Sequence, residues 1–144
     1  MFRKIVVAYN ASPESQRALA SAIELAKSLN AEVQAVTVKS DLPAYTAYAG
    51  ALDPTVMETL RADQLTEYES LQAKACALAA TRGIELRSHL IDGGTVESIV
   101  DFVRTHRADL LVIGLHPRGS HIARMWSTVY ELAQEAPCCV LGVH

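Results

Sequence analysis

The sequence has few residues that would cross-link the chain, and little net charge. Its 144 residues include only three cysteines, Cys76, Cys138 and Cys139. An odd number with an adjacent pair argues against a disulfide framework, because neighbouring residues on a strand point to opposite faces. We therefore expect three reduced, buried thiols. The formal net charge of −3 gives no reason to expect a general attraction to nucleic acid or to an acidic membrane.

Long apolar runs are also absent. The sequence holds no stretch of about 18 apolar residues, so no membrane-spanning helix is expected. Met1-Phe2-Arg3-Lys4 leads straight into an apolar segment without the layout of a signal peptide, and we expect a cytoplasmic protein. The length suits a single domain over residues 1–144, which can bury enough surface to fold without a disulfide or a metal.

Short apolar segments alternate with segments of helical period along the chain. Nearly continuous apolar runs predict strands at 4–9, 31–38, 84–91, 109–114 and 138–143, the third with one wetter face. Helices are predicted between them, at 13–29, 54–82, 96–106 and 120–135. This alternation implies right-handed crossovers and a parallel sheet covered on both faces, so the predicted fold class is α/β.

Two of these segments carry more specific expectations. The long helix has an apolar stripe from Met57 to Leu78, which predicts one buried side. Residues 39–53, with Tyr45 and Tyr48, read as an irregular loop that covers a sheet edge, the alternative being a lid or a partner surface.

Two loops are predicted to matter for function. In parallel α/β folds, ligands bind at the carboxyl ends of the strands, where the strand order reverses. These positions correspond to residues 10–12, after the first strand, and 114–120, after the fourth. The second loop reads Gly-Leu-His-Pro-Arg-Gly-Ser and opens a helix, whose positive end and loop amides would favour an anion.

Four stretches of the sequence together indicate a family. They are KIVVAYNASPESQRALASAIELAKSLNAEV, DGGTVESIV, HRADLLVIG and STVYELAQEAPCCVLGV, in this order and spacing. With them the chain resembles the universal stress protein family from end to end. The resemblance implies a three-layer sandwich around a five-stranded parallel sheet of order 3-2-1-4-5, the adenine nucleotide alpha hydrolase-like fold. It also implies a homodimer that pairs through the last strand, here with the interface residues Cys139, Val140, Leu141 and Val143.

The resemblance further concerns nucleotide binding. Many members of that family bind ATP through the pattern G-x2-G-x9-G-[ST] and an aspartate after the first strand. Gly114 and Thr128 match the first glycine and the final hydroxyl, whereas Pro117, Ser127 and Asn10 replace the second glycine, the third glycine and the aspartate. Proline has no N–H to donate to a phosphate, and the Cβ of serine hinders close approach. Asparagine lacks the charge and the second carboxylate oxygen of aspartate.

Two functions therefore stay open. In the first, the chain is a dimeric interaction or regulatory module of the stress response, which acts on an unidentified protein partner without tight ATP binding. In the second, it is a switch that binds ATP or AMP, with magnesium, and at most hydrolyses ATP slowly. Arg118 and the pair Gly119-Ser120 favour the second, because they could rebuild an anion nest at a shifted register. The candidate nucleotide-binding residues are Ala8, Asn10, Val38, Gly114, Arg118, Ser127 and Thr128.

Neither a catalytic residue nor a metal site is predicted. No serine stands in a Gly-x-Ser-x-Gly elbow. His116 and His121 have no carboxylate or thiol nearby in the sequence, so we expect solvated histidines there.

Overall fold

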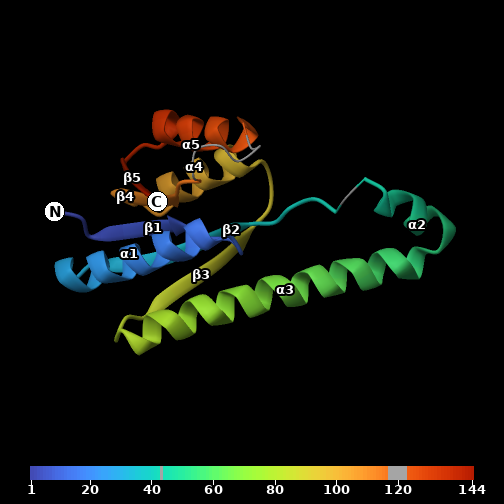
Figure 1. Cartoon of the computed structure of the whole chain (residues 1–144), viewed down its shortest axis with the longest axis horizontal. Coiled ribbons are helices and arrows are strands. Elements are labelled where there is room, and N and C mark those ends of the chain that lie inside the picture. Colours follow the sequence, from blue (N-terminus) through green and yellow to red (C-terminus); the bar gives the residue numbers. More distant parts are fainter. Residues whose placement is uncertain (43, 117–122) are drawn as a thin grey trace.

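Five parallel strands with helices on both faces make up the part of the chain that the computed structural model describes, residues 1–42, 44–116 and 123–144 (Figure 1). For residues 123–127 only the backbone is described. In chain order the elements are β1 (Lys4–Ala8), α1 (Pro13–Leu29), β2 (Glu32–Val38), α2 (Thr46–Leu52), α3 (Pro54–Thr81), β3 (Leu86–Ile91), α4 (Thr95–Thr105), β4 (Leu110–Gly114), α5 (Ala123–Glu135) and β5 (Cys139–Val143).

The sheet has the order β3-β2-β1-β4-β5, and every pairing in it is parallel. In the register of the central strands, Val6 of β1 lies beside Gln34 of β2 and Leu111 of β4. Both the α/β class and the strand order are thereby confirmed. The sequence predicts that the third strand, β3, has one face more exposed to water than the other. Its place at an edge of the sheet explains this partial exposure.

The sheet separates two apolar cores. On one face, α1 and α3 cover side chains such as Ile5 and Val112, and on the other, α4 and α5 cover Val6 and Leu111 (Figure 1). Alternate residues of β1 and β4 thus enter opposite cores, which is why these strands are apolar throughout.

The start and end of α1 follow the local sequence. The side chain of Ser12 caps the helix by accepting a hydrogen bond from the amide of Ser15, and Pro13 occupies the first turn. Asn30 ends the helix in the left-handed conformation, with φ of 52°. The Ser12 cap and Pro13 fix the end of α1 that faces the loop after β1.

The expectation that residues 39–53 are irregular is wrong for their second half, which forms α2. This helix is too short to show a period in the sequence. It packs on α3 at Gly50, where an added Cβ would lie about 2.1 Å from Cγ of Met57. The described residues of this segment do not give the expected cover of a sheet edge, because α2 lies beyond the end of the sheet, with Tyr45 and Tyr48 exposed (Figure 1).

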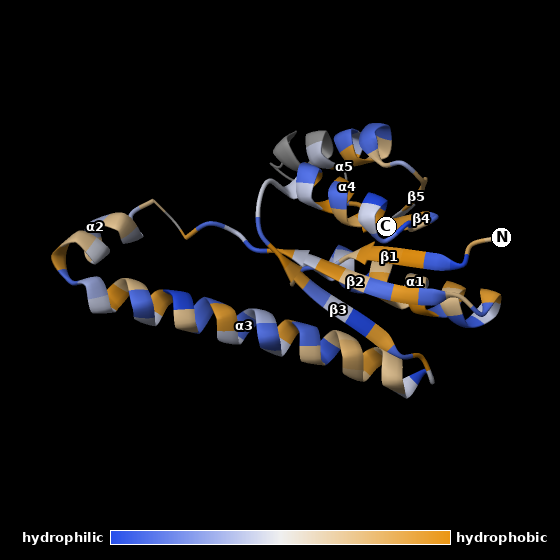
Figure 2. Cartoon of the chain, turned by 180° about the vertical axis from the view of Figure 1, so that it is seen from behind, coloured by the Kyte–Doolittle hydropathy of each residue, from blue (hydrophilic) through white to orange (hydrophobic). Residues whose placement is uncertain are grey.

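The stripe predicted along α3 is buried only towards its C-terminal end. There Ala75 and Ala79 are fully buried against β3 and α1, whereas Leu65 is 44% exposed. Figure 2 shows apolar and polar residues alternating along the half of α3 that extends past the sheet. One further expectation fails, since Cys139 is exposed and Cys76 and Cys138 are only partly buried.

Candidate functional site

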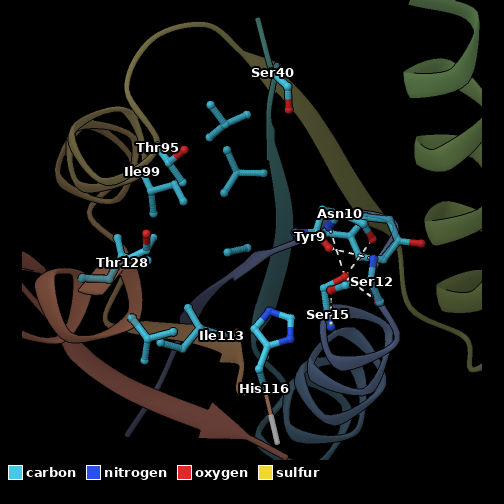
Figure 3. A pocket seen from close by; sticks show the side chains of 16 residues that line it. Tyr9, Asn10, Ser12, Ser15, Ser40, Thr95, Ile99, Ile113, His116 and Thr128 are labelled. Atoms are coloured by element: carbon cyan, nitrogen blue, oxygen red, sulfur yellow. Dashed lines mark hydrogen bonds between the residues drawn. The ribbon is translucent and has the colours of Figure 1, made fainter. Parts of the chain in front are cut away.

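A pocket of about 290 Å³ opens at the carboxyl ends of β1, β2 and β4 (Figure 3). It lies between the start of α1, the start of α4 and the middle of α5. The predicted candidates that line it are Ala8, Asn10, Val38, Gly114 and Thr128. Arg118 falls outside the described residues, as does the side chain of Ser127.

The loop after β1 forms the rim of the pocket through a compact hydrogen-bond network. Oδ1 of Asn10 accepts a hydrogen bond from the amide of Ser12 at 2.8 Å. Oγ of Ser15 accepts from the amide of Asn10 at 3.1 Å and lies 2.7 Å from the carbonyl oxygen of Asn10, to which it donates. Ser15 is 4% exposed, so its hydroxyl is shielded from water, whereas Asn10 itself is exposed. In the sequence, the place of Ser15 three residues after the N-cap marks it only as a residue of the first helical turn, and its role at the rim is visible only in the structure.

Gly114 brings the end of β4 unusually close to α1. A Cβ at this position would lie 2.5 Å from the carbonyl carbon of Glu14 and 2.7 Å from the amide nitrogen of Ser15. Both of these are backbone atoms, so a side chain would force the strand and the helix apart. The first glycine of the family pattern therefore has a packing reason in this chain, independent of any ligand.

His116 faces the pocket and is not the solvated residue that the sequence suggests (Figure 3). Its side chain is only 15% exposed, and its Nδ1 lies 3.4 Å from Oε2 of Glu14. The other carboxylate oxygen of Glu14 lies 3.8 Å from the guanidinium of Arg17. His116 thus joins the residues after β4 to the first turn of α1.

The walls of the pocket are aliphatic and its polar groups are mostly neutral. Val36, Ile99, Ile113, Val129 and Leu132 form the walls, and hydroxyl groups from Ser40, Thr95 and Thr128 lie among them (Figure 3). Neither lysine nor arginine occurs among its lining residues in the described part of the chain. Such a pocket suits a flat apolar ring with a few polar edges, and the described residues offer little to neutralise several phosphate charges.

Tyr9, which also lines the pocket, is held by the strands beside it. Its carbonyl oxygen accepts a hydrogen bond from Oγ1 of Thr37 at 2.8 Å, and its amide donates to the carbonyl of Val36 at 2.9 Å. Burial raises the pKa of its phenol above the usual value of 10.0, so the side chain is neutral at physiological pH.

Within residues 1–42, 44–116 and 123–144, no three histidine, cysteine, aspartate or glutamate side chains come together as a metal site would require. The helices described there include none with the length and apolar character needed to cross a membrane.

The fold and the pocket define a class of protein, in which a parallel sheet is covered by helices on both faces and a pocket lies where the strand order reverses. The model of the universal stress protein family matches residues 1–144, so the chain belongs to that family. Universal stress protein C of Salmonella typhi is 31% identical to it over 115 residues, which cover 80% of this chain and 83% of that protein. The structure of universal stress protein UspA from Lactobacillus plantarum has a TM-score of 0.78 at 23% identity, with 99% of this chain and 98% of that chain covered.

Two further solved relatives carry nucleotides. A universal stress protein in complex with cAMP has a TM-score of 0.74 at 21% identity, and the match covers 99% of this chain and 97% of that one. A universal stress protein family protein from Arabidopsis thaliana with AMP bound has a TM-score of 0.72 at 18% identity, covering 98% of this chain and 90% of that one. At these identities the likeness concerns the fold.

Proposed function

We propose that this chain is a cytoplasmic, single-domain regulatory module of the stress response whose pocket binds an adenine mononucleotide such as AMP. ATP, with or without magnesium, is held no more tightly than AMP. The proposal joins the two functions that the sequence leaves open, because a module without tight ATP binding can still respond to a nucleotide of lower charge.

The observation that carries the proposal is the make-up of the pocket. Five of the seven candidate nucleotide-binding residues line one pocket, and its aliphatic walls suit a purine ring. The polar groups around these walls can meet the edge of a base or the hydroxyls of a ribose. Relatives of the same fold that carry cAMP or AMP support a mononucleotide as the ligand.

The absence of lysine and arginine from the described pocket lining disfavours a triphosphate. His116 also lines the pocket, and the carboxylate of Glu14 already lies beside it. In addition, Pro117 has no amide proton for a phosphate, whatever its surroundings.

Calorimetric titration of the nucleotide-stripped protein tests this proposal. We expect saturable binding of AMP and no gain in affinity for ATP, with or without magnesium. The triple variant Asn10→Asp, Pro117→Gly, Ser127→Gly restores the family pattern and should bind ATP at least tenfold more tightly than the wild type, which is about 1.4 kcal/mol. Tight, magnesium-dependent binding of ATP to the wild type, or no binding of any adenine nucleotide, would contradict the proposal.

We also propose that two copies of the chain pair through β5. In the described part of the chain this strand pairs only with β4, so its other edge is free. Leu141 on it is 36% exposed, and a free apolar edge strand readily pairs with another strand. Sedimentation velocity should show a dimer for the wild type and a monomer for Leu141→Lys. Leu65→Lys, which adds the same charge at an exposed leucine of α3, should stay dimeric, and equal behaviour of the two variants would refute pairing through β5.

A further inference from the structure

Ser40 lines three neighbouring pockets of the molecule. One is the pocket described above, and Ser40 lies at its rim (Figure 3). The second, of about 710 Å³, runs between the loop after β1 and α3, and the third, of about 570 Å³, lies between the residues after β2 and the first half of α3. Among the lining residues that the structure describes, only Ser40 borders all three.

The backbone of Ser40 is held by side chains of α3, not by the sheet. The last sheet-like hydrogen bond along this segment runs from the amide of Lys39 to the carbonyl of Ile91 at 2.8 Å. One residue further on, the amide of Ser40 donates to the phenol oxygen of Tyr68 at 2.7 Å. The carbonyl oxygen of Ser40 accepts from Nε2 of Gln64 at 2.9 Å.

These two contacts act together as a clamp. Gln64 and Tyr68 are four residues apart, so they stand on one side of α3, one turn from each other. Between them they satisfy both backbone groups of Ser40, which fixes the position of this residue relative to α3. The hydroxyl of Ser40 takes no part in the clamp and makes no hydrogen bond to another described residue.

We propose that Tyr68 and Gln64 are positioning residues of the pocket, which hold Ser40 so that its hydroxyl meets a polar edge of the bound nucleotide. This inference rests on the proposed function, because it needs a ligand in the pocket. It makes the affinity of the pocket depend on α3, although neither Tyr68 nor Gln64 lines it. A change in the position of α3 would then be transmitted to the ligand through the clamp.

The test uses the full chain with single substitutions on α3, alone and together with Ser40→Ala. Tyr68→Phe removes the phenol oxygen that accepts a hydrogen bond from the Ser40 amide, and it keeps the ring. Gln64→Met removes the side-chain amide that donates to the Ser40 carbonyl, and it keeps the length of the side chain. Thr59→Val is the matched control, because the Thr59 hydroxyl donates only to the carbonyl of Thr55 in the same helix, at 3.0 Å. Hydrogen exchange of the Ser40 amide, measured by NMR without nucleotide, reports on the clamp itself.

We expect Tyr68→Phe to speed this exchange and to raise the Kd for AMP roughly twofold to tenfold, as the loss of one neutral hydrogen bond would. Thr59→Val should leave both unchanged. A positioning residue acts through the group that it holds, so in a Ser40→Ala background Tyr68→Phe should raise the Kd no further. A purely structural role of Tyr68 would weaken binding equally in both backgrounds.

Any other result for the hydrogen exchange or for the Kd would contradict one part of the inference. Unchanged exchange in Tyr68→Phe would show that the clamp does not exist. Faster exchange with an unchanged Kd, or equal losses with and without the Ser40 hydroxyl, would show that the clamp does not position a ligand group. If the wild type binds no AMP, the proposed function fails and ligand positioning fails with it, while the exchange measurement separately decides whether the clamp exists.

Discussion

At the scale of single residues, Ser15 holds the rim of the pocket. Its hydroxyl bonds to both backbone groups of Asn10 and lies 3.0 Å from the carbonyl oxygen of Ser12. Ser15→Ala would leave the partly buried amide and carbonyl of Asn10 without this partner. We predict a loss of about 1–3 kcal/mol in the free energy of unfolding.

Urea denaturation monitored by circular dichroism measures this loss. Ser70→Ala is the control, because Ser70 is exposed on α3, and it should change stability by less than about 0.5 kcal/mol. Equal stability of the two variants would mean that the network around Asn10 contributes nothing.

A second residue-scale prediction concerns His89 on β3. Its Nε2 lies 2.9 Å from Oε1 of Gln34, and its ring centroid lies 4.9 Å from that of Phe102 and 5.5 Å from that of His106. Burial lowers the pKa of His89 below its usual 6.5, and the nearby charges of His106 and Arg87 lower it further.

The sign of the pH effect follows from this shift. The unfolded chain takes up a proton at His89 near pH 6.5, whereas the folded chain does so only at lower pH. The contribution of His89 to stability is therefore present above pH 6.5 and is lost as the pH falls towards the lower pKa of the folded state. Unfolding curves at about pH 7.5 and about pH 5.5 should show a smaller loss for His89→Gln than for the wild type. His144→Gln, at an exposed histidine, serves as the control, and an equal loss in all three proteins would contradict the prediction.

At the scale of elements, α3 is a helix with two environments. Ala79 is fully buried in the core under β3, whereas Ala62 is exposed on the half that extends past the sheet. Ala79→Leu should destabilise the protein by about 1–3 kcal/mol, because it overfills a packed core. Ala62→Leu adds the same atoms and should change stability by less than about 0.5 kcal/mol. Thermal unfolding compares the two, and similar melting temperatures would show that α3 is not anchored by its C-terminal half.

The elements also show how far the sequence can predict this structure. The period of its side chains predicts α3 and its apolar stripe, but the period cannot tell where along the helix a core is available. The positions of β3 and α1 decide that Ala75 is buried and Leu65 is not. In the same way, α2 is too short to have a visible period, and its contact with α3 through Gly50 is a tertiary one.

At the scale of the whole molecule, the alternation of strands and helices predicts a parallel sheet with its site at the carboxyl ends of the strands, and the family resemblance implies the strand order. Asn10 and Gly114 are far apart in the sequence, yet both line the pocket because β1 and β4 are neighbours. The contacts of His116 with Glu14, and of Ser40 with Tyr68, could not be predicted. They join residues that follow β4 and β2 to α1 and α3, and the positions of these two helices depend on how they pack on the sheet.

The central claim is that an adenine mononucleotide binds at the carboxyl ends of β1, β2 and β4. The most direct test is an NMR titration of the isotope-labelled protein with AMP, which follows every backbone amide at once. We predict saturable shifts at Asn10, Ser40, Gly114 and Thr128, with the amide of Tyr48 on α2 unmoved. Saturable shifts centred on another part of the molecule, or no shifts at a large excess of AMP, would contradict the account.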